Sequence, residues 1–249
     1  MISNLRLSNF GINCWKWQYL FVLTFTFTLA GTHKASSFDQ SDLERLQQTN
    51  SCQNCNLKGV NLAGATLMGA NLEGANLQGA NLEGANLENA NLKKAKLKGV
   101  SKPTILASAN LKNADLSEAK LNGAVLFQAN LEGANLSRAD LSVVLVTLLN
   151  TMSIHCTDLR EANLSGANLS HANLRIEVPV GDRWIAHGGA PLRTENVCNP
   201  GFVGANFSRA NLKDAELDGI ELKQIVLCET IMPNGSISNF NCTEKLQSK

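Results

Sequence analysis

Large aromatic side chains are scarce in this chain. Only 5% of its 249 residues are Phe, Trp or Tyr, although 44% are apolar. A conventional core of this size uses more large rings, whereas the apolar residues here are mostly Leu and Ala. The composition therefore indicates a narrow and repetitive interior.

An excess of charge of either sign is also absent. The formal net charge is +1, with 22 basic and 21 acidic residues. Proteins dedicated to nucleic-acid binding usually carry a basic excess, so we expect no nucleic-acid partner. The same balance argues against a strongly acidic surface.

The N-terminus lacks an apolar run long enough to span a bilayer comfortably. Residues 19–30 carry no charge and follow the basic residues Arg6 and Lys16. As a helix this run covers about 18 Å, against a bilayer core of roughly 30 Å. The segment therefore predicts a signal peptide, residues 1–30, with cleavage after residue 30 or 35. An uncleaved membrane anchor is the alternative, and we expect membrane contact only through this segment.

Cysteine usage agrees with export. Six cysteines lie beyond the leader: Cys52, Cys55, Cys156, Cys198, Cys228 and Cys242. An even number of cysteines in an exported chain indicates disulfide bonds, but it leaves fifteen possible pairings.

The spacing of these cysteines suggests pairings without fixing them. Cys52 and Cys55 fit a disulfide, half a zinc site or a redox pair. A zinc site needs two further ligands, and none is near in sequence, so a structural disulfide is favoured and no metal is predicted. A bond between Cys228 and Cys242 would fasten the C-terminal turn that they bracket. Cys156 and Cys198 then pair by elimination.

The dominant pattern is a five-residue repeat. From Cys55 the chain reads CNLKG VNLAG ATLMG ANLEG ANLQG ANLEG. Leu, or once Phe, recurs at every fifth position in four blocks, at residues 57–97, 106–141, 159–174 and 207–227. A fixed period sustained over this length is typical of solenoid proteins.

A period of five fits neither a helix nor a flat strand. Successive leucines would move about 140° around a helix axis, and on a strand they would alternate between faces. All the leucines stay buried if the chain itself turns once per repeat. Glycines such as Gly59 and Gly64 follow Leu by two residues and ease that corner. Alanines such as Ala70 and Ala75 are small enough to share the interior.

These repeats resemble the pentapeptide-repeat family, whose consensus is A(D/N)LXX. The resemblance covers residues 52–174 and 205–242. It implies an all-β fold, a right-handed quadrilateral β-helix with four pentads per coil. The chain is similar to exported members common in cyanobacteria, which implies a periplasmic or thylakoid-lumen location.

The open ends of a solenoid need caps. Ser41 to Glu44 fits a capping box, so we expect a short helix over residues 42–49 within a capping region at 36–51. At the other end, Pro233 and the Asn234-Gly235 pair predict a turn that stops the repeat. Residues 243–249 form a tail.

Two stretches interrupt the repeat. Residues 142–156 lose the motif but stay apolar, and we interpret them as a degenerate coil; an exposed apolar patch for a partner is the alternative. Residues 175–204 are rich in Pro and Gly and predict a loop insertion, either a neutral insert or a contact site. The candidate partner contacts in this loop are Arg183, Trp184, His187 and Arg193.

The sequence contains no recognisable catalytic set, and we predict neither an enzyme nor a bound cofactor. The favoured function is a structural scaffold or a protein-interaction module with a protein partner of unknown identity. One alternative is a ligand-binding or enzymatic role carried by the 175–204 loop. Another is mimicry of DNA, as in family members that bind DNA gyrase, which the neutral charge and the lysines between residues 93 and 102 disfavour.

Overall fold

The computed structural model describes part of the chain: residues 38–99, 102–142, 144–148, 151–175, 199–220 and 222–242. For residues 144–148, 151–155 and 199–200 only the backbone is described. The chain divides into two units, Met1–Ala35 and Ser36–Lys249, and every described residue belongs to the second. The predicted signal peptide at 1–30 and the tail at 243–249 lie outside the described residues.

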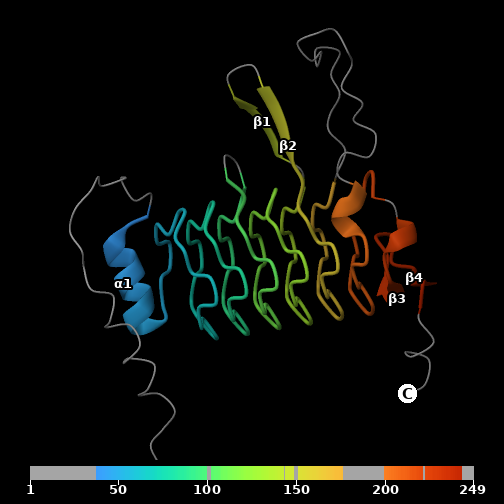
Figure 1. Ribbon diagram of the computed structural model, residues 1–249. Helices are drawn as coiled ribbons and strands as arrows, with labels where there is room; N and C mark the ends of the chain where they lie inside the picture. Colours follow the sequence, from blue (N-terminus) through green and yellow to red (C-terminus); the bar gives the residue numbers. More distant parts are fainter. Residues whose placement is uncertain are drawn as a thin grey trace, which may run out of the picture. The chain divides into compact units, whose positions relative to one another are not determined.

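The described unit is a β-helix solenoid, because residues 20 apart pair through parallel bridges. Asn56 bridges Asn76, and Asn71 bridges Asn91. Twenty residues hold four pentads, so the bridges form four ladders that run from coil to coil (Figure 1). We name them by their first members: the first ladder begins at Ser51, the second at Asn56, the third at Asn61 and the fourth at Thr66.

The interior consists of the repeated leucines and alanines. Leu72, Leu77 and Leu82 have no exposed surface, and neither has Ala75. The prediction that the leucine column is buried is confirmed except near the C-terminal end, where Leu217 and Leu222 are partly buried. Each buried Leu contributes about 1.5–3 kcal/mol before conformational entropy is subtracted.

Each regular repeat turns the chain through a tight β-turn. The backbone nitrogen of Ala70 donates to the carbonyl oxygen of Leu67 at 3.0 Å, and Gly69 between them has a φ of 64°. A positive φ at the third position of such a turn favours Gly. The predicted corner glycines are thus confirmed, but residues such as Lys94 (φ 59°) and Arg138 (φ 58°) adopt the same conformation.

Asparagine has two roles in the repeat. The Oδ1 atom of Asn130 accepts from the backbone nitrogen of Glu132 at 3.2 Å, which supports the turn. Its side-chain amide donates to Oδ1 of Asn110 in the preceding coil, also at 3.2 Å. In the fourth ladder this stacking joins Asn86, Asn110, Asn130, Asn163 and Asn206.

Helix α1 (Gln40–Thr49) covers the first coil and begins two residues before the predicted start. The cap is Asp39 and not Ser41, because the Asp39 carboxylate accepts from the Ser41 backbone nitrogen and hydroxyl at 2.8 and 2.7 Å. These bonds, led by the Ser41 hydroxyl, hold the pKa of Asp39 below its usual 3.8. Leu46 is buried against the core, and Leu43 packs there partly buried.

The C-terminal end closes with an antiparallel hairpin. Strand β3 (Leu227–Ile231) pairs with β4 (Ile237–Phe240) after the short 3₁₀ helix η2 (Leu222–Gln224). The predicted turn is present, since the Gly235 nitrogen donates to the Met232 carbonyl at 2.8 Å.

The interpretation of residues 142–156 as a degenerate coil was wrong. Strand β1 (Val144–Leu148) pairs antiparallel with β2 (Thr151–His155), and the third ladder passes directly from Val125 to Asp158. The segment satisfies its backbone hydrogen bonds within a hairpin outside the coil, which Figure 1 shows projecting from the solenoid.

The second interruption ends earlier than predicted. Gly201 and Phe202 already belong to a coil, since the Leu159 nitrogen donates to the Gly201 carbonyl at 2.6 Å and Phe202 is 2% exposed. Phe202 closes the 3₁₀ helix η1 (Asn199–Phe202). The coil therefore resumes within the stretch assigned to the 175–204 loop, of which residues 176–198 lie outside the described part.

Candidate functional site

All three departures from the regular coil occur at one corner, between the second and third ladders. The chain leaves after Gly99, Ser142 and Arg175, and it rejoins the third ladder at Ile105, Asp158 and Gly201. We call this corner the insertion edge and define it by these six residues. The other three corners carry no insertion among the described coils. The arrangement gathers irregular chain along one line of an otherwise uniform surface.

Two buried threonines hold the bases of the first two insertions. The Thr104 hydroxyl accepts from the Gly79 backbone nitrogen at 2.9 Å and lies 3.2 Å from the Leu77 carbonyl, to which it donates. Thr157 makes the same two bonds to Gly123 and Leu121, both at 3.1 Å.

These hydroxyls replace a displaced carbonyl group. In a regular coil the equivalent nitrogen, that of Gly59, donates to a backbone carbonyl, that of Gln78. An insertion moves this acceptor away, and a buried N–H without an acceptor is costly. The repeat pattern gave no signal for this role of Thr104 and Thr157, because each stands where Ala is usual.

Lysines gather around the base of the first insertion. Lys96 and Lys120 are bridge partners in the second ladder, and Lys98 and Lys102 lie on either side of the first departure. None of these four forms an ion pair within the described part of the chain. This part of the insertion edge therefore presents positive charge.

The third ladder borders the insertion edge with apolar groups. Ile105 and Val125 occupy positions that are usually Asn, and both are partly exposed. The Arg160 guanidinium lies 5.4 Å from the centre of the neighbouring Phe127 ring. Hydrogen bonds of 2.9 and 2.7 Å to the carboxylate of Asp158 raise the pKa of Arg160. Apolar and cationic groups beside each other suit a protein interface.

The predicted partner contacts Arg183, Trp184, His187 and Arg193 lie outside the described residues. They remain predictions. On their N-terminal side the nearest described residue is Arg175, which belongs to the insertion edge, and on their C-terminal side it is Asn199, two residues before Gly201 of that edge.

The structure contains the first two suggested disulfides. Cys52 bonds Cys55 and Cys228 bonds Cys242, with Cα atoms 5.3 and 4.9 Å apart. Cys156 is also disulfide-bonded, to a partner outside the described residues. The suggested partner, Cys198, is itself outside the described part, so that pairing stays a prediction.

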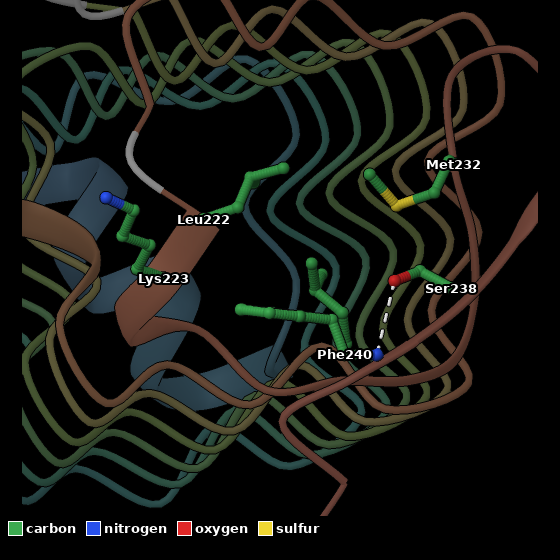
Figure 2. Close-up of a pocket in the computed structure, with 6 residues that line it drawn as sticks. Leu222, Lys223, Met232, Ser238 and Phe240 are labelled. Atoms are coloured by element: carbon green, nitrogen blue, oxygen red, sulfur yellow. Dashed lines mark hydrogen bonds between the residues drawn. The ribbon is translucent and has the colours of Figure 1, made fainter.

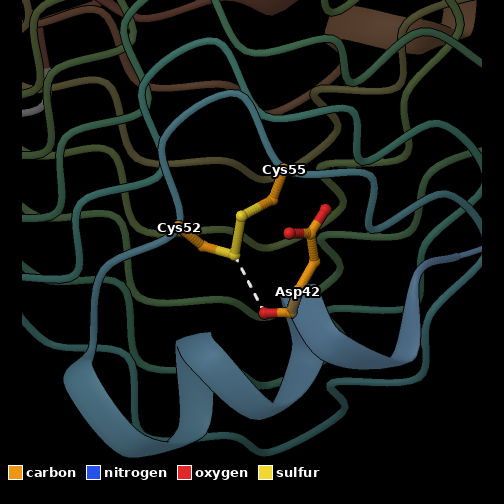
Figure 3. A group of neighbouring side chains, drawn as sticks. All are labelled: Asp42, Cys52 and Cys55. Atoms are coloured by element: carbon orange, nitrogen blue, oxygen red, sulfur yellow. Dashed lines mark hydrogen bonds between the residues drawn. A yellow bond between two sulfur atoms is a disulfide. The ribbon is translucent and has the colours of Figure 1, made fainter.

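One cluster has the composition of a metal site. Potential ligand atoms of Asp42, Cys52 and Cys55 lie within 4.8 Å of one another, and no other such group of three occurs among the described residues (Figure 3). A cysteine binds zinc as a thiolate, and here the two sulfur atoms are bonded to each other. In this form the cluster is a disulfide with a neighbouring carboxylate.

A hollow of about 580 Å³ lies at the C-terminal end of the solenoid (Figure 2). Leu222, Met232 and Phe240 provide apolar walls, and the Ser238 hydroxyl accepts from the Phe240 nitrogen at 3.3 Å. Lys223 also lines it. Among its lining residues only Lys223 has an ionisable side chain.

The described residues include no helix with both the length and the apolar character needed to cross a bilayer. Disulfide bonds are typical of proteins in oxidising compartments outside the cytosol. The bonds of Cys52 and Cys228 thus indicate an exported protein.

Parallel ladders, a leucine interior and a turn in each regular pentad define a repeat protein of the β-solenoid class. The family model for pentapeptide repeats matches eight copies, at residues 51–84, 67–101, 104–142, 155–175 and 202–241. The chain belongs to the pentapeptide-repeat family. No curated protein sequence matches it significantly.

Solved structures of the same family are similar to this chain. HetL, involved in heterocyst differentiation regulation in the cyanobacterium Nostoc sp. strain PCC 7120, is 33% identical over 76% of this chain and 66% of its own, with a TM-score of 0.40. AT2G44920, from the Arabidopsis thaliana thylakoid lumen, is 25% identical over 55% of this chain and 72% of its own, with a TM-score of 0.31. QnrB1, a plasmid-mediated fluoroquinolone resistance protein, is 18% identical over 76% and 92%, with a TM-score of 0.31.

Proposed function

We propose that the chain is a non-enzymatic scaffold that binds a protein partner along the insertion edge. The observation that carries this proposal is the shared position of the three departures, after Gly99, Ser142 and Arg175. Segments that leave a rigid scaffold often carry its binding residues. Because all three departures occur at one corner, the inserted segments start along one edge of the solenoid, where a single partner can contact them together.

The surface beside this edge supports a protein partner. It combines the partly exposed side chains of Ile105 and Val125 with the lysines Lys96 and Lys120. A DNA mimic needs a continuous acidic face, which is unlike this edge and unlike a chain of net charge +1. An acidic or mixed protein surface with an apolar centre is the matching chemistry.

The proposal includes the finer features of the fold and its location. Four pentads per coil support a right-handed solenoid with four sides, of the kind found in the family. The two disulfides and the leader-like N-terminus support export by a signal peptide, to the periplasm or the thylakoid lumen.

Affinity capture with the chain lacking its leader tests the proposed edge. Three baits are compared: the wild-type chain, a chain in which residues 176–198 are replaced by a short Gly-Ser link, and one in which 143–155 is replaced likewise. A fourth bait, Lys112→Glu with Glu132→Lys, is the matched control, since it exchanges an exposed ion pair of 3.0 Å that lies just after the fourth-ladder residues Asn110 and Asn130.

A partner that the wild type and the control capture, and that at least one deletion loses, supports the proposal. Circular dichroism must show that each variant keeps the wild-type unfolding midpoint within a few degrees. Retention of every partner by both deletions contradicts the insertion edge. A small molecule that co-purifies with the wild type and is lost with residues 176–198 contradicts the scaffold function and favours a ligand-binding one.

A further inference from the structure

The two sulfur atoms of the Cys52–Cys55 disulfide have different neighbours in helix α1. The Arg45 guanidinium nitrogen Nη2 lies 2.8 Å from Sγ of Cys55. The backbone carbonyl oxygen of Asp42 lies 3.0 Å from Sγ of Cys52, as Figure 3 shows. A disulfide sulfur has no proton to donate and is a weak acceptor. Neither contact is therefore strong in the oxidised form.

A reduced pair would make better use of both contacts. A Cys55 thiolate would accept a charge-assisted hydrogen bond from Arg45, and neighbouring cations stabilise thiolates. A Cys52 thiol would donate its proton to the Asp42 carbonyl. The surroundings of the disulfide thus suit one thiol and one thiolate, each at a defined cysteine.

The Asp42 carboxylate moderates this preference. Its Oδ1 atom lies 2.6 Å from the same Arg45 nitrogen, and its Oδ2 atom accepts from the Asn56 backbone nitrogen at 2.7 Å. Its negative charge weakens the attraction between Arg45 and a thiolate. Among the charged side chains in contact with the disulfide, Arg45 and Asp42 therefore act in opposite directions.

We propose that Cys52 and Cys55 form a redox-active site that accepts two electrons from a dithiol. A thiolate of the dithiol attacks Sγ of Cys52, the sulfur–sulfur bond breaks, and its electron pair moves to Cys55 as a thiolate, which Arg45 stabilises once helix α1 has closed again. The second sulfur of the dithiol then displaces Cys52, which takes up one proton. The dithiol becomes a disulfide, and its other proton goes to solvent.

Access to this site depends on helix α1. Cys52 and Cys55 are 0% and 1% exposed, and Leu46 of the helix is 2% exposed above the first coil. An incoming thiolate reaches Cys52 only when α1 moves away. Reduction is therefore coupled to opening of the N-terminal cap, which breaks the hydrogen bonds of the Asn56 backbone to Asp39 and Asp42.

Redox titration of the full chain tests the proposal. The protein is equilibrated with mixtures of reduced and oxidised dithiothreitol at pH 7, quenched with acid, alkylated and analysed by peptide mass spectrometry. The Cys228–Cys242 bond is the internal control. We expect Cys52–Cys55 to be half reduced at a ratio of reduced to oxidised dithiothreitol at least about tenfold lower than the control requires, a factor that corresponds to about 1.4 kcal/mol in the free energy of reduction.

Two substitutions separate the chemistry from loosening of the helix. Arg45→Met should make reduction about tenfold harder and remove the thiolate absorbance near 240 nm, whereas Arg45→Lys should retain most of both. Asp42→Asn should make reduction easier. A helix that is only loosened would ease reduction in every variant, so the opposite signs distinguish the two effects.

Joint reduction of both bonds, only where circular dichroism shows the solenoid unfolding, would overturn the proposal. The proposal would also be overturned if Cys52–Cys55 in Arg45→Met were half reduced at the same dithiothreitol ratio as in the wild type. Should Arg45→Met fail to fold, Arg45→Lys is compared with Asp42→Asn instead. The dithiothreitol ratio at half reduction and the thiolate absorbance near 240 nm then test whether Arg45 stabilises the Cys55 thiolate.

Discussion

The hydroxyl oxygen of Thr104 lies 2.9 Å from the backbone nitrogen of Gly79, 25 residues earlier, and accepts its hydrogen bond. Thr157 stands in the same relation to Gly123. Each pair lies where the chain rejoins the coil after an insertion. A side chain thus supplies the acceptor that the backbone supplies elsewhere, and this allows the coils to continue in register.

Replacement of Thr104 by Val should lower the free energy of unfolding by about 1–3 kcal/mol, because it leaves the Gly79 N–H buried without an acceptor. Urea unfolding followed by circular dichroism measures the loss. Thr66→Val is the matched control at an exposed position, with an expected change within about 0.5 kcal/mol. Equal effects at the two positions would contradict the role of the Thr104 hydroxyl.

Gly64 should tolerate Asn better than Ala. Its φ is 65°, and an added Cβ would have no atom within 4 Å, so backbone conformation alone determines the cost. Gly64→Ala should lower the free energy of unfolding by about 1 kcal/mol, and Gly64→Asn by less, since Asn adopts this conformation more readily. Thermal unfolding of Gly64→Ala and Gly64→Asn compares them. Similar losses in both would show that φ does not control this corner.

Leu82→Asp should interrupt the solenoid. Leu82 has no exposed surface, so the substitution buries a carboxylate and leaves a cavity, at a cost of roughly 4 kcal/mol or more. Hydrogen exchange should show loss of amide protection in the coils next to it. Glu83→Lys, at an exposed neighbouring position, should leave both protection and stability unchanged; the idea fails if the two variants behave alike.

In the fourth ladder, Asn→Asp should destabilise the protein at a position whose side-chain amide donates a hydrogen bond, and much less at a position that only accepts one. Asn130 donates to Asn110 at 3.2 Å, so Asn130→Asp faces two oxygen atoms towards each other and should cost about 1–2 kcal/mol. Asn86 only accepts in this ladder, and Asn86→Asp should be close to neutral. Chemical denaturation of the two variants at pH 7 makes the comparison. A larger loss in Asn86→Asp would contradict the assigned direction.

The leucine period predicted the coil because each pentad has to bury its Leu side chain. Leu82 must be buried whatever its neighbours are, and a period of five allows this only in a chain that turns at every repeat. The hairpin at 144–155 was missed because Val and Leu suit a coil interior and a strand equally well. Asp39 was missed as the cap since Ser41, two residues later, offers the same chemistry.

The candidate sites were less predictable than the fold. The spacing of Cys52 and Cys55 indicated a bond, but Arg45 reaches Cys55 only through the way helix α1 lies over the first coil. The role of Thr104 as a hydrogen-bond acceptor can be recognised only once it is known which backbone carbonyl the insertion displaces. Both features depend on contacts between distant segments, which a local repeat does not encode.

The insertion edge also fixes a set of distances. In the second ladder two bridges separate Lys96 from Asp140, and one separates Asp140 from Asn173. At about 4.8 Å per stacked strand, the departure points stand roughly 10 and 5 Å apart. Foreign peptides inserted after Gly99, Ser142 and Arg175 would be attached at these spacings. The chain could therefore display closely spaced epitopes at set distances from one another.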